Sequence, residues 1–170
     1  MITAIVYCSK TGFTQNYAAM LSKKTGLPCC SLEKALKTQK PEGAVLFLGW
    51  LSAGAVKGYK KAAAAFPVEG VCAVGVMPGT PASIAKRNGI SCPVFPLPGG
   101  VDYQKLRGVD RLALKFVAKT VGGKTPGNEK EAKIFAALRD GGDLTDPACL
   151  ADVLSFLQTA TVQDDKKEAF

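Results

Sequence analysis

Short apolar runs alternate with helical patterns along the first hundred residues. Because the intervals between these runs are long enough for crossover helices, the pattern predicts an α/β fold with parallel strands and right-handed connections. The apolar runs that we interpret as strands cover about residues 2–7, 27–31, 44–49, 71–77 and 93–97. The intervening helical patterns cover about residues 14–24, 31–34, 58–65 and 80–88.

The last third of the chain has a helical pattern throughout. Helices are predicted over residues 103–121, 128–139 and 147–157, and the charged tail 163–170 is expected to fray. The loop 122–127 contains Gly-Lys-Thr, but Ala118 stands where a Walker A loop needs its first glycine. At this length the chain is expected to form one domain over residues 1–170, with the C-terminal helices starting at about residue 102. Apolar positions at helical spacing in 103–121 are Leu106, Val109, Leu112, Ala113, Phe116 and Val117.

The loop after the first predicted strand has the composition of a phosphate site. It reads Ser9, Lys10, Thr11, Gly12, Phe13, Thr14 and leads directly into a helix. The first backbone N–H groups of a helix lack partners within the helix, and the helix dipole adds partial positive charge there. The hydroxyl groups, the lysine and a glycine that lets the backbone approach a ligand fit the same purpose.

Two common phosphate motifs are absent from this loop, which contains neither a Walker A pattern nor the G-x-G-x-x-G dinucleotide pattern. A hydroxyl-rich loop with a single glycine suits one terminal phosphate monoester. The alternative is an ordinary turn between a strand and a helix, with serine and threonine as caps.

Composition places the chain among ordinary globular proteins, with 47% hydrophobic and 21% charged residues. The apolar runs are too short to span a bilayer, and no signal peptide is visible, so we expect a cytoplasmic protein. The formal net charge of +8 comes from scattered Lys and Arg residues without interleaved aromatics, so we expect no nucleic-acid partner. The charge indicates a solvated positive surface or a docking surface for an acidic redox partner.

Histidine is absent, which excludes Ser-His-Asp and Cys-His catalysis and a Cys/His zinc site. We therefore predict no metal site and assign no catalytic residue. The cysteines form no C-x-x-C pair and are expected to be mostly buried thiols, and the role of the Cys29-Cys30 pair stays open. The six cysteines are Cys8, Cys29, Cys30, Cys72, Cys92 and Cys149.

The segment I-V-Y-C-S-K-T-G-F-T-Q-N resembles the phosphate loop of flavodoxins, which has the core [ST]-x-T-G-x-T after the first strand. The resemblance implies a flavodoxin-like three-layer sandwich with a five-stranded parallel sheet in the order 2-1-3-4-5. It also implies flavin mononucleotide (FMN) as the cofactor. In such a fold the ligand lies at the carboxyl ends of the strands, between the loops after the first and third strands.

Two further loops are implied as parts of a flavin site. In flavodoxins a glycine follows the third strand and an aromatic residue often stacks on the ring, so Trp50 either covers the flavin or turns into the core. The usual aromatic position, before the second glycine, holds Ala53 here. The residues that the resemblance adds to the first loop are Gly49, Trp50, Leu51, Ser52, Ala53 and Gly54, and, after the fourth strand, Met77, Pro78, Gly79 and Thr80.

The run from Leu97 to Leu106 is similar to a G-G-x-D-x-x-x-L signature of a less typical flavodoxin branch, related to the protoporphyrinogen-oxidase-like flavodoxins. The alternative is that Asp102 caps the next helix and the two glycines turn the chain. The positive net charge departs from the acidic character of most flavodoxins.

The resemblance predicts an FMN-dependent electron carrier that acts between redox partner proteins, including acidic ones, as a monomer or weak dimer. The first alternative is an FMN-dependent oxidoreductase of the same fold, such as a quinone reductase or a protoporphyrinogen-oxidase-like enzyme. A flavin-free interaction module is the second alternative. A carrier needs only an exposed flavin edge, whereas an enzyme needs a pocket over the ring.

Overall fold

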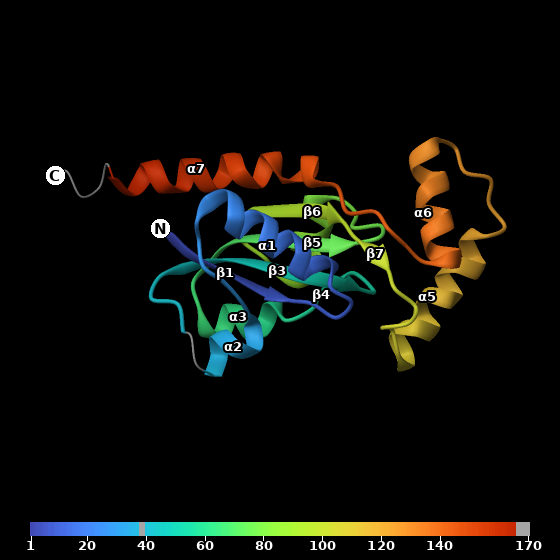
Figure 1. Cartoon of the computed structure of the whole chain (residues 1–170), viewed down its shortest axis with the longest axis horizontal. Coiled ribbons are helices and arrows are strands. Elements are labelled where there is room, and N and C mark those ends of the chain that lie inside the picture. The colour runs from blue at the N-terminus through green and yellow to red at the C-terminus, as the bar shows by residue number, and fades with distance from the viewer. Residues whose placement is uncertain (38–39, 166–170) are drawn as a thin grey trace.

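The fold is built on one mostly parallel sheet, shown in Figure 1. The structure is a computed structural model that describes residues 1–37 and 40–165. Along the sheet the strand order is β2-β1-β3-β5-β6, and each neighbouring pair in that order is parallel. The strands are β1 (Ile2–Cys8), β2 (Cys29–Ser31), β3 (Ala44–Ser52), β5 (Val68–Gly75) and β6 (Val94–Pro98).

The prediction of a five-stranded sheet in the order 2-1-3-4-5 was wrong in strand count and order. The sheet has six strands, because β4 (Ala55–Val56) pairs antiparallel with the end of β3. The predicted third strand ended at residue 49, but β3 continues to Ser52 and turns back through Ala53 and Gly54. Both turn residues have positive φ, 49° and 78°, as two-residue hairpin turns require.

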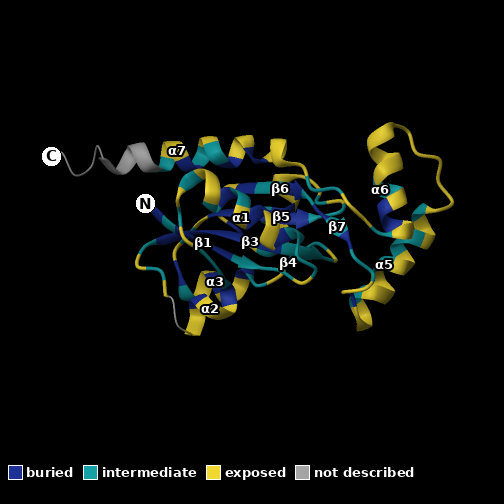
Figure 2. Cartoon of the chain, in the orientation of Figure 1, coloured by how far each residue is buried: buried dark blue, intermediate teal, exposed yellow. Residues whose placement is uncertain are grey.

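Helices cover both faces of the sheet and make a three-layer α/β sandwich. The apolar side chains of α1 and α7 pack on one face, and those of α2, α3 and α4 pack on the other. Figure 2 shows the resulting band of buried residues along the strands. The helices are α1 (Phe13–Thr25), α2 (Leu32–Lys37), α3 (Tyr59–Ala65), α4 (Pro81–Asn88) and α7 (Ala151–Asp165).

The continuous apolar run of the third strand follows from burial on both faces. Val45 and Phe47 belong to the cluster under α2, α3 and α4, whereas Leu46 and Leu48 belong to the cluster under α1 and α7. All four side chains are completely buried. Successive residues of a strand point to opposite faces, so a central strand between two helix layers needs apolar residues at every position.

After β6 the chain leaves the sheet and forms a separate lobe, which we define as residues 100–143. Figure 1 shows the lobe beyond the strand ends, at the right of the view. An antiparallel pair, Gly100↔Asp143 and Val101↔Gly142, forms its neck, and the chain then returns to the sandwich. The elements of this excursion are β7 (Gly100–Val101), α5 (Gly108–Val121), α6 (Glu129–Asp140), β8 (Gly142–Asp143) and the 3₁₀ helix η1 (Pro147–Leu150).

Tyr17 of α1 fastens both ends of this excursion to the sandwich. Its side chain is completely buried, and burial raises the pKa of Tyr17 to about 12, so the hydroxyl stays protonated. The hydroxyl donates to the carbonyl of Pro98 at 2.7 Å and accepts from the N–H of Asp146 at 2.9 Å. One side chain of the sandwich core is therefore hydrogen-bonded to the chain just before the lobe and just after it.

The C-terminal helices were predicted with inexact limits. The helix expected from residue 103 begins at Gly108, because residues 102–106 form a turn in which Asp102 accepts from the N–H groups of Gln104 and Lys105. Residues 163–165, expected to fray, continue α7, and residues 166–170 of that predicted tail lie outside the described residues. Within 1–37 and 40–165, no helix combines the length and hydropathy of a bilayer-spanning segment.

Candidate functional site

The first loop, residues 9–14, connects β1 to α1 in a tight turn. Gly12 is the N-cap of α1 and has a φ of 104°, a conformation that side chains with a Cβ rarely adopt. Its N–H donates to Ser9 Oγ at 3.2 Å, and Thr14 is buried with 2% exposure. A Cβ at Gly12 would meet nothing within 4 Å among the described residues, so the space in front of this turn is open.

The N-terminus of α1 lacks a side-chain cap, in contrast to three other helical starts. Thr80 caps α4, Asn128 caps α6 and Asp146 caps η1, each through a side-chain oxygen that accepts a backbone N–H. The N-cap of α1 is a glycine and forms no side-chain cap, and among the described residues the N-caps of α3 and α5 form none either. Uncapped first-turn amides are the groups that bind an anion at a helix start.

A cavity of about 300 Å³ lies at the carboxyl ends of the strands, at the low end of the size range of ligand pockets. It is lined by the first loop and by the loop of residues 49–54 at the end of β3, which we call the second loop, and α5 lines it from the side of the lobe. Ten of the sixteen predicted site residues line it: Lys10, Thr11, Phe13, Thr14, Trp50, Leu51, Ser52, Ala53, Gly54 and Met77.

The other six predicted site residues have other places. Gly49 lies inside β3, where a Cβ would come within 2.5 Å of the Val56 side chain, so this glycine allows close packing of the hairpin. Thr80 accepts the N–H of Ser83 and starts α4. Of the third loop, residues 77–80 after β5, Met77 lines the cavity and the other three residues do not. The predicted site residues outside the cavity lining are Ser9, Gly12, Gly49, Pro78, Gly79 and Thr80.

Trp50 borders the cavity and is half-buried, so it is not a residue of the closed core. Lys10 Nζ lies 5.4 Å and Lys57 Nζ 5.9 Å from the centre of its ring, both within the range of cation–π contacts. An indole hydrogen bond to Cys8 partly offsets the burial that raises the pKa of that thiol. These three contacts hold the ring beside the first loop.

Asp110 of α5 was not predicted as a site residue, but it lines the cavity and contacts two of the predicted loops. Lys10 Nζ donates to one carboxylate oxygen, and Ser52 Oγ donates to the other at 3.1 Å. The Lys10 hydrogen bond holds the pKa of Asp110 below its usual value, so the carboxylate is charged at neutral pH. A carboxylate of the lobe is thus hydrogen-bonded to Lys10 of the first loop and to Ser52 of the second loop.

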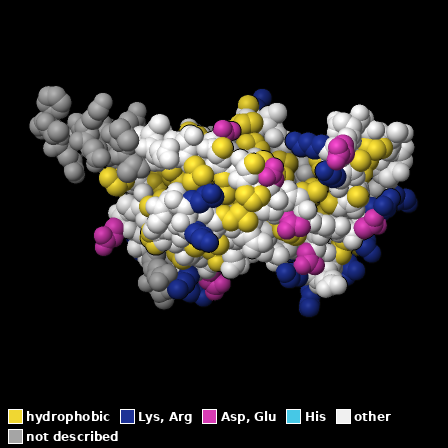
Figure 3. Space-filling model, turned by 45° about the horizontal axis from the view of Figure 1, so that its top comes forward, with side chains coloured by type: hydrophobic (Ala, Val, Ile, Leu, Met, Phe, Trp, Pro, Cys, Tyr) yellow, Lys and Arg dark blue, Asp and Glu magenta, His cyan; other side chains and the backbone are white. Residues whose placement is uncertain are grey.

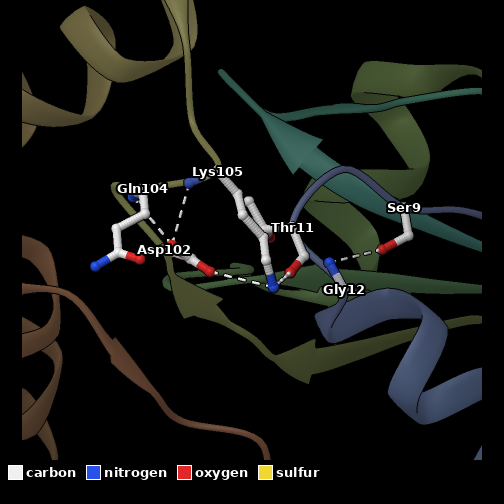
Figure 4. A network of polar contacts seen from close by, with 6 residues as sticks. All are labelled: Ser9, Thr11, Gly12, Asp102, Gln104 and Lys105. Carbon is white, nitrogen blue, oxygen red and sulfur yellow. Dashed lines mark hydrogen bonds and ion pairs between the residues drawn. The ribbon is translucent and has the colours of Figure 1, made fainter.

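Lys105 makes a second connection between the lobe and the first loop, drawn in Figure 4. Its ammonium group donates to the Thr11 carbonyl at 3.4 Å and lies 3.3 Å from the Asp102 carboxylate. The side chain is 62% exposed, so it can leave this carbonyl at low cost. Lys10 and Lys105 together place two cations at the first loop.

The helical spacing of Asp110 could have identified it as a site residue. Along α5, Asp110 lies on the same side as Leu114 and Val117, and all three line the cavity. A single acidic residue on the inward stripe of a helix indicates a polar partner in the facing element. The first loop contains the lysine that serves as this partner.

The phosphate end of the cavity fits a flavin monophosphate, whereas Asp110 does not. The uncapped α1 amides, open space at Gly12 and two lysines suit a phosphate group. The apolar lining from Val74 to Met77 and the Trp50 ring suit a flat aromatic ligand. The Asp110 carboxylate would compete with a phosphate for Lys10 and would repel it, so a phosphate would bind here only after Lys10 leaves this contact.

The cysteine expectation holds fully only for Cys72. Cys72 is completely buried, and burial raises the pKa of its thiol. Cys149 is exposed and the other four are intermediate, with all six reduced. The prediction of mostly buried thiols was therefore too strong.

Comparison of the chain with protein-family models, with curated proteins and with solved structures gave no significant match. The interpretation of the site therefore depends on the residues and geometry described above.

Proposed function

We propose that this protein is a flavodoxin-like redox protein that binds FMN and passes electrons between partner proteins. The observation that carries the proposal is the meeting of the first and second loops at one cavity, beside the uncapped start of α1. A bound flavin supplies the electron-transfer chemistry. The chain's own groups bind the phosphate, surround the ring and limit access of water.

The phosphate would be held by the first-turn amides of α1, the hydroxyl groups of Thr11 and Thr14, and Lys10 once Asp110 releases it. Each of these groups donates, and a phosphate only accepts, so no donor is left without a role. Trp50 would lie along the ring end of the cavity, where it already lines the wall.

A carrier role is favoured over chemistry on a small substrate by the ionisable groups of the cavity. Among the described residues that line it, only Lys10 and Asp110 have charged side chains, and they form an ion pair with each other. A reaction that needs a general acid or base would have to break this pair.

A second candidate, an FMN-dependent oxidoreductase, is favoured by the position of α5. This helix covers the cavity with Leu114 and Val117, and Leu106 in the preceding turn adds to an apolar wall of the kind that a substrate pocket needs. Turnover of NAD(P)H with a quinone in the absence of a partner protein would support the enzyme, and its absence would support the carrier.

The proposal is tested by titrating the purified protein with FMN and with riboflavin while recording flavin absorbance and fluorescence. We expect Thr11→Val and Thr14→Val each to weaken FMN roughly tenfold, because a hydrogen bond to a charged group contributes about 1.5 kcal/mol or more. Riboflavin has no phosphate, so its affinity should be lower than that of FMN, and the two substitutions should change it little.

Thr159→Val in α7 is the matched control, because this threonine bonds only to carbonyls of its own helix. Equal affinity for FMN and riboflavin, or an unchanged FMN affinity in both first-loop variants, would overturn the phosphate assignment. A folded protein that binds neither flavin would instead support the flavin-free interaction module.

A further inference from the structure

Helix α5 carries an apolar stripe on its outward side that no other element covers in the described structure. We define this outer stripe as Val109, Leu112 and Phe116, whose exposed fractions are 81%, 69% and 73%. These residues follow one another at intervals of three and four, so their side chains lie in one row. Half of the exposed large hydrophobic residues among the described residues belong to this row.

The outer stripe is not the face with which α5 holds the lobe together. Leu114, Val117, Ala118 and Val121 point inward, towards Leu138 and the rest of the lobe core. The helix therefore carries two apolar faces, and among the described residues only the inward one is packed against other elements. An exposed apolar row of this kind is typical of an interaction surface.

A basic face borders the outer stripe on the same helix. Arg111, Lys115 and Lys119 repeat at intervals of four residues, and Asp110 is the only acidic residue between 108 and 121. That carboxylate is paired with Lys10, so it does not neutralise the basic face. Figure 3 shows Lys and Arg side chains along the end of the molecule that the lobe forms.

The outer stripe also lies next to the cavity opening. Ala113 lies one helical turn from Val109 and from Phe116, and it lines the cavity. Met77 lines the same cavity and is 52% exposed. An occupant of the outer stripe would therefore stand about one helix diameter, roughly 10 Å, from a ligand in the cavity.

From these observations we infer that the outer stripe and the basic face of α5 form a docking surface for an acidic electron-transfer protein. Apolar contacts would supply affinity at the centre, and the lysines and arginine would steer acidic side chains of the partner to the rim. The outer stripe consists of three apolar residues, which fits the small interfaces of transient redox complexes. The redox role of the partner rests on the proposed function, whereas the docking itself does not.

Charge argues against a second copy of this chain as the occupant. A two-fold contact through the outer stripe would bring two basic faces together, and like charges at an interface disfavour association. An anionic lipid surface would satisfy the same charges, but it would close the cavity opening without offering an electron donor or acceptor. The test therefore includes both alternatives.

The experiment measures binding of a dye-labelled plant-type [2Fe–2S] ferredoxin, an acidic one-electron protein, to the flavin-free protein by fluorescence anisotropy at low salt. We expect saturable binding that weakens as ionic strength rises, and at least tenfold weaker binding for Leu112→Ser and Phe116→Ser. Lys115→Glu should weaken binding at low salt and have less effect at high salt.

Leu36→Ser and Lys60→Glu are matched controls, because both residues are exposed and lie in α2 and α3, far from the lobe in the chain. Circular dichroism confirms that each variant is folded. Since no flavin is present, the result does not depend on whether FMN binds, which the titrations above decide separately.

Four results would overturn the inference. Ferredoxin that binds the outer-stripe variants as tightly as the unchanged protein places docking elsewhere. Absence of ferredoxin binding together with binding to phosphatidylserine vesicles identifies a lipid surface, and concentration-dependent dimers lost in Phe116→Ser identify a second copy. Absence of all three kinds of binding means that the outer stripe docks none of them and also refutes the inference.

Discussion

Removal of the Asp110 charge should increase the affinity of the protein for FMN. In the structure this carboxylate accepts hydrogen bonds from Lys10 and Ser52, two residues of the predicted flavin loops. Asp110→Asn keeps the shape of the side chain and abolishes the charge. A change in FMN affinity in this variant therefore reports the competition for Lys10 and not a change in the packing of α5.

The expected gain follows from two contributions. The Asp110 side chain is 26% exposed and that of Lys10 is 35% exposed, so their ion pair is screened and contributes at most about 1 kcal/mol. Repulsion between the carboxylate and a phosphate at a partly solvated site adds on the order of 1 kcal/mol. Together they predict FMN affinity that is roughly five- to thirtyfold higher in the variant.

The assay is quenching of flavin fluorescence during titration, with FMN and riboflavin compared for each protein. Riboflavin affinity should stay within about twofold, because a neutral ligand does not compete with the carboxylate for Lys10. Asp140→Asn is the control, since this exposed aspartate in α6 pairs with Arg139 and does not line the cavity. An Asp110→Asn variant that is folded and binds FMN equally or more weakly would refute the competition.

Three substitutions test the surrounding structure by thermal unfolding. Gly100→Ala should lower stability by about 1–3 kcal/mol, because the added Cβ would lie 2.5 Å from the Phe13 ring; an unchanged melting temperature would contradict this packing. Tyr17→Phe should cost about 1–3 kcal/mol and speed proteolysis of the lobe, since it leaves one carbonyl and one N–H of the neck region unpaired; unchanged cleavage would show that the hydroxyl does not hold the lobe. Ala53→Gly should stabilise by about 0.5–1 kcal/mol, because only this non-glycine residue among those described has a positive φ, and a loss of stability would argue against the hairpin turn.

The sandwich could be predicted because a strand buried on both faces is apolar at every position of its sequence. The run Ala44 to Leu48 is apolar at every position, and it forms the central strand between two helix layers. The prediction ended this strand at residue 49, the end of the apolar run, whereas β3 continues to Ser52. Gly49 makes room for the Val56 side chain, a contact across a hairpin that spacing along the chain does not reveal.

The lobe was harder to predict because its helix α5 has apolar residues on two sides. The apolar positions at helical spacing included Val109, Leu112, Phe116 and Val117 without showing which of them are buried, and the first three are exposed. Packing against α6 selected the other face, with Leu114 and Val117. The choice between two apolar faces depends on the partner helix, which periodicity alone does not identify.

The third loop shows how one motif can serve a local purpose. Thr80 was expected to contribute to a flavin site, but its hydroxyl and the Ser83 side chain form a capping box at the start of α4. Pro81 at the first helical position strengthens the same helix start. A threonine before proline therefore indicated the cap at least as strongly as it indicated a ligand.

The central claim is that the start of α1 binds the phosphate of FMN, and amide chemical shifts measure this most directly. In ¹H–¹⁵N spectra of the labelled protein, we predict that added FMN shifts the amides of Gly12, Phe13 and Thr14 and the indole N–H of Trp50, while riboflavin leaves the three amides almost unchanged. Saturating FMN that leaves these three amide resonances in place would contradict the account.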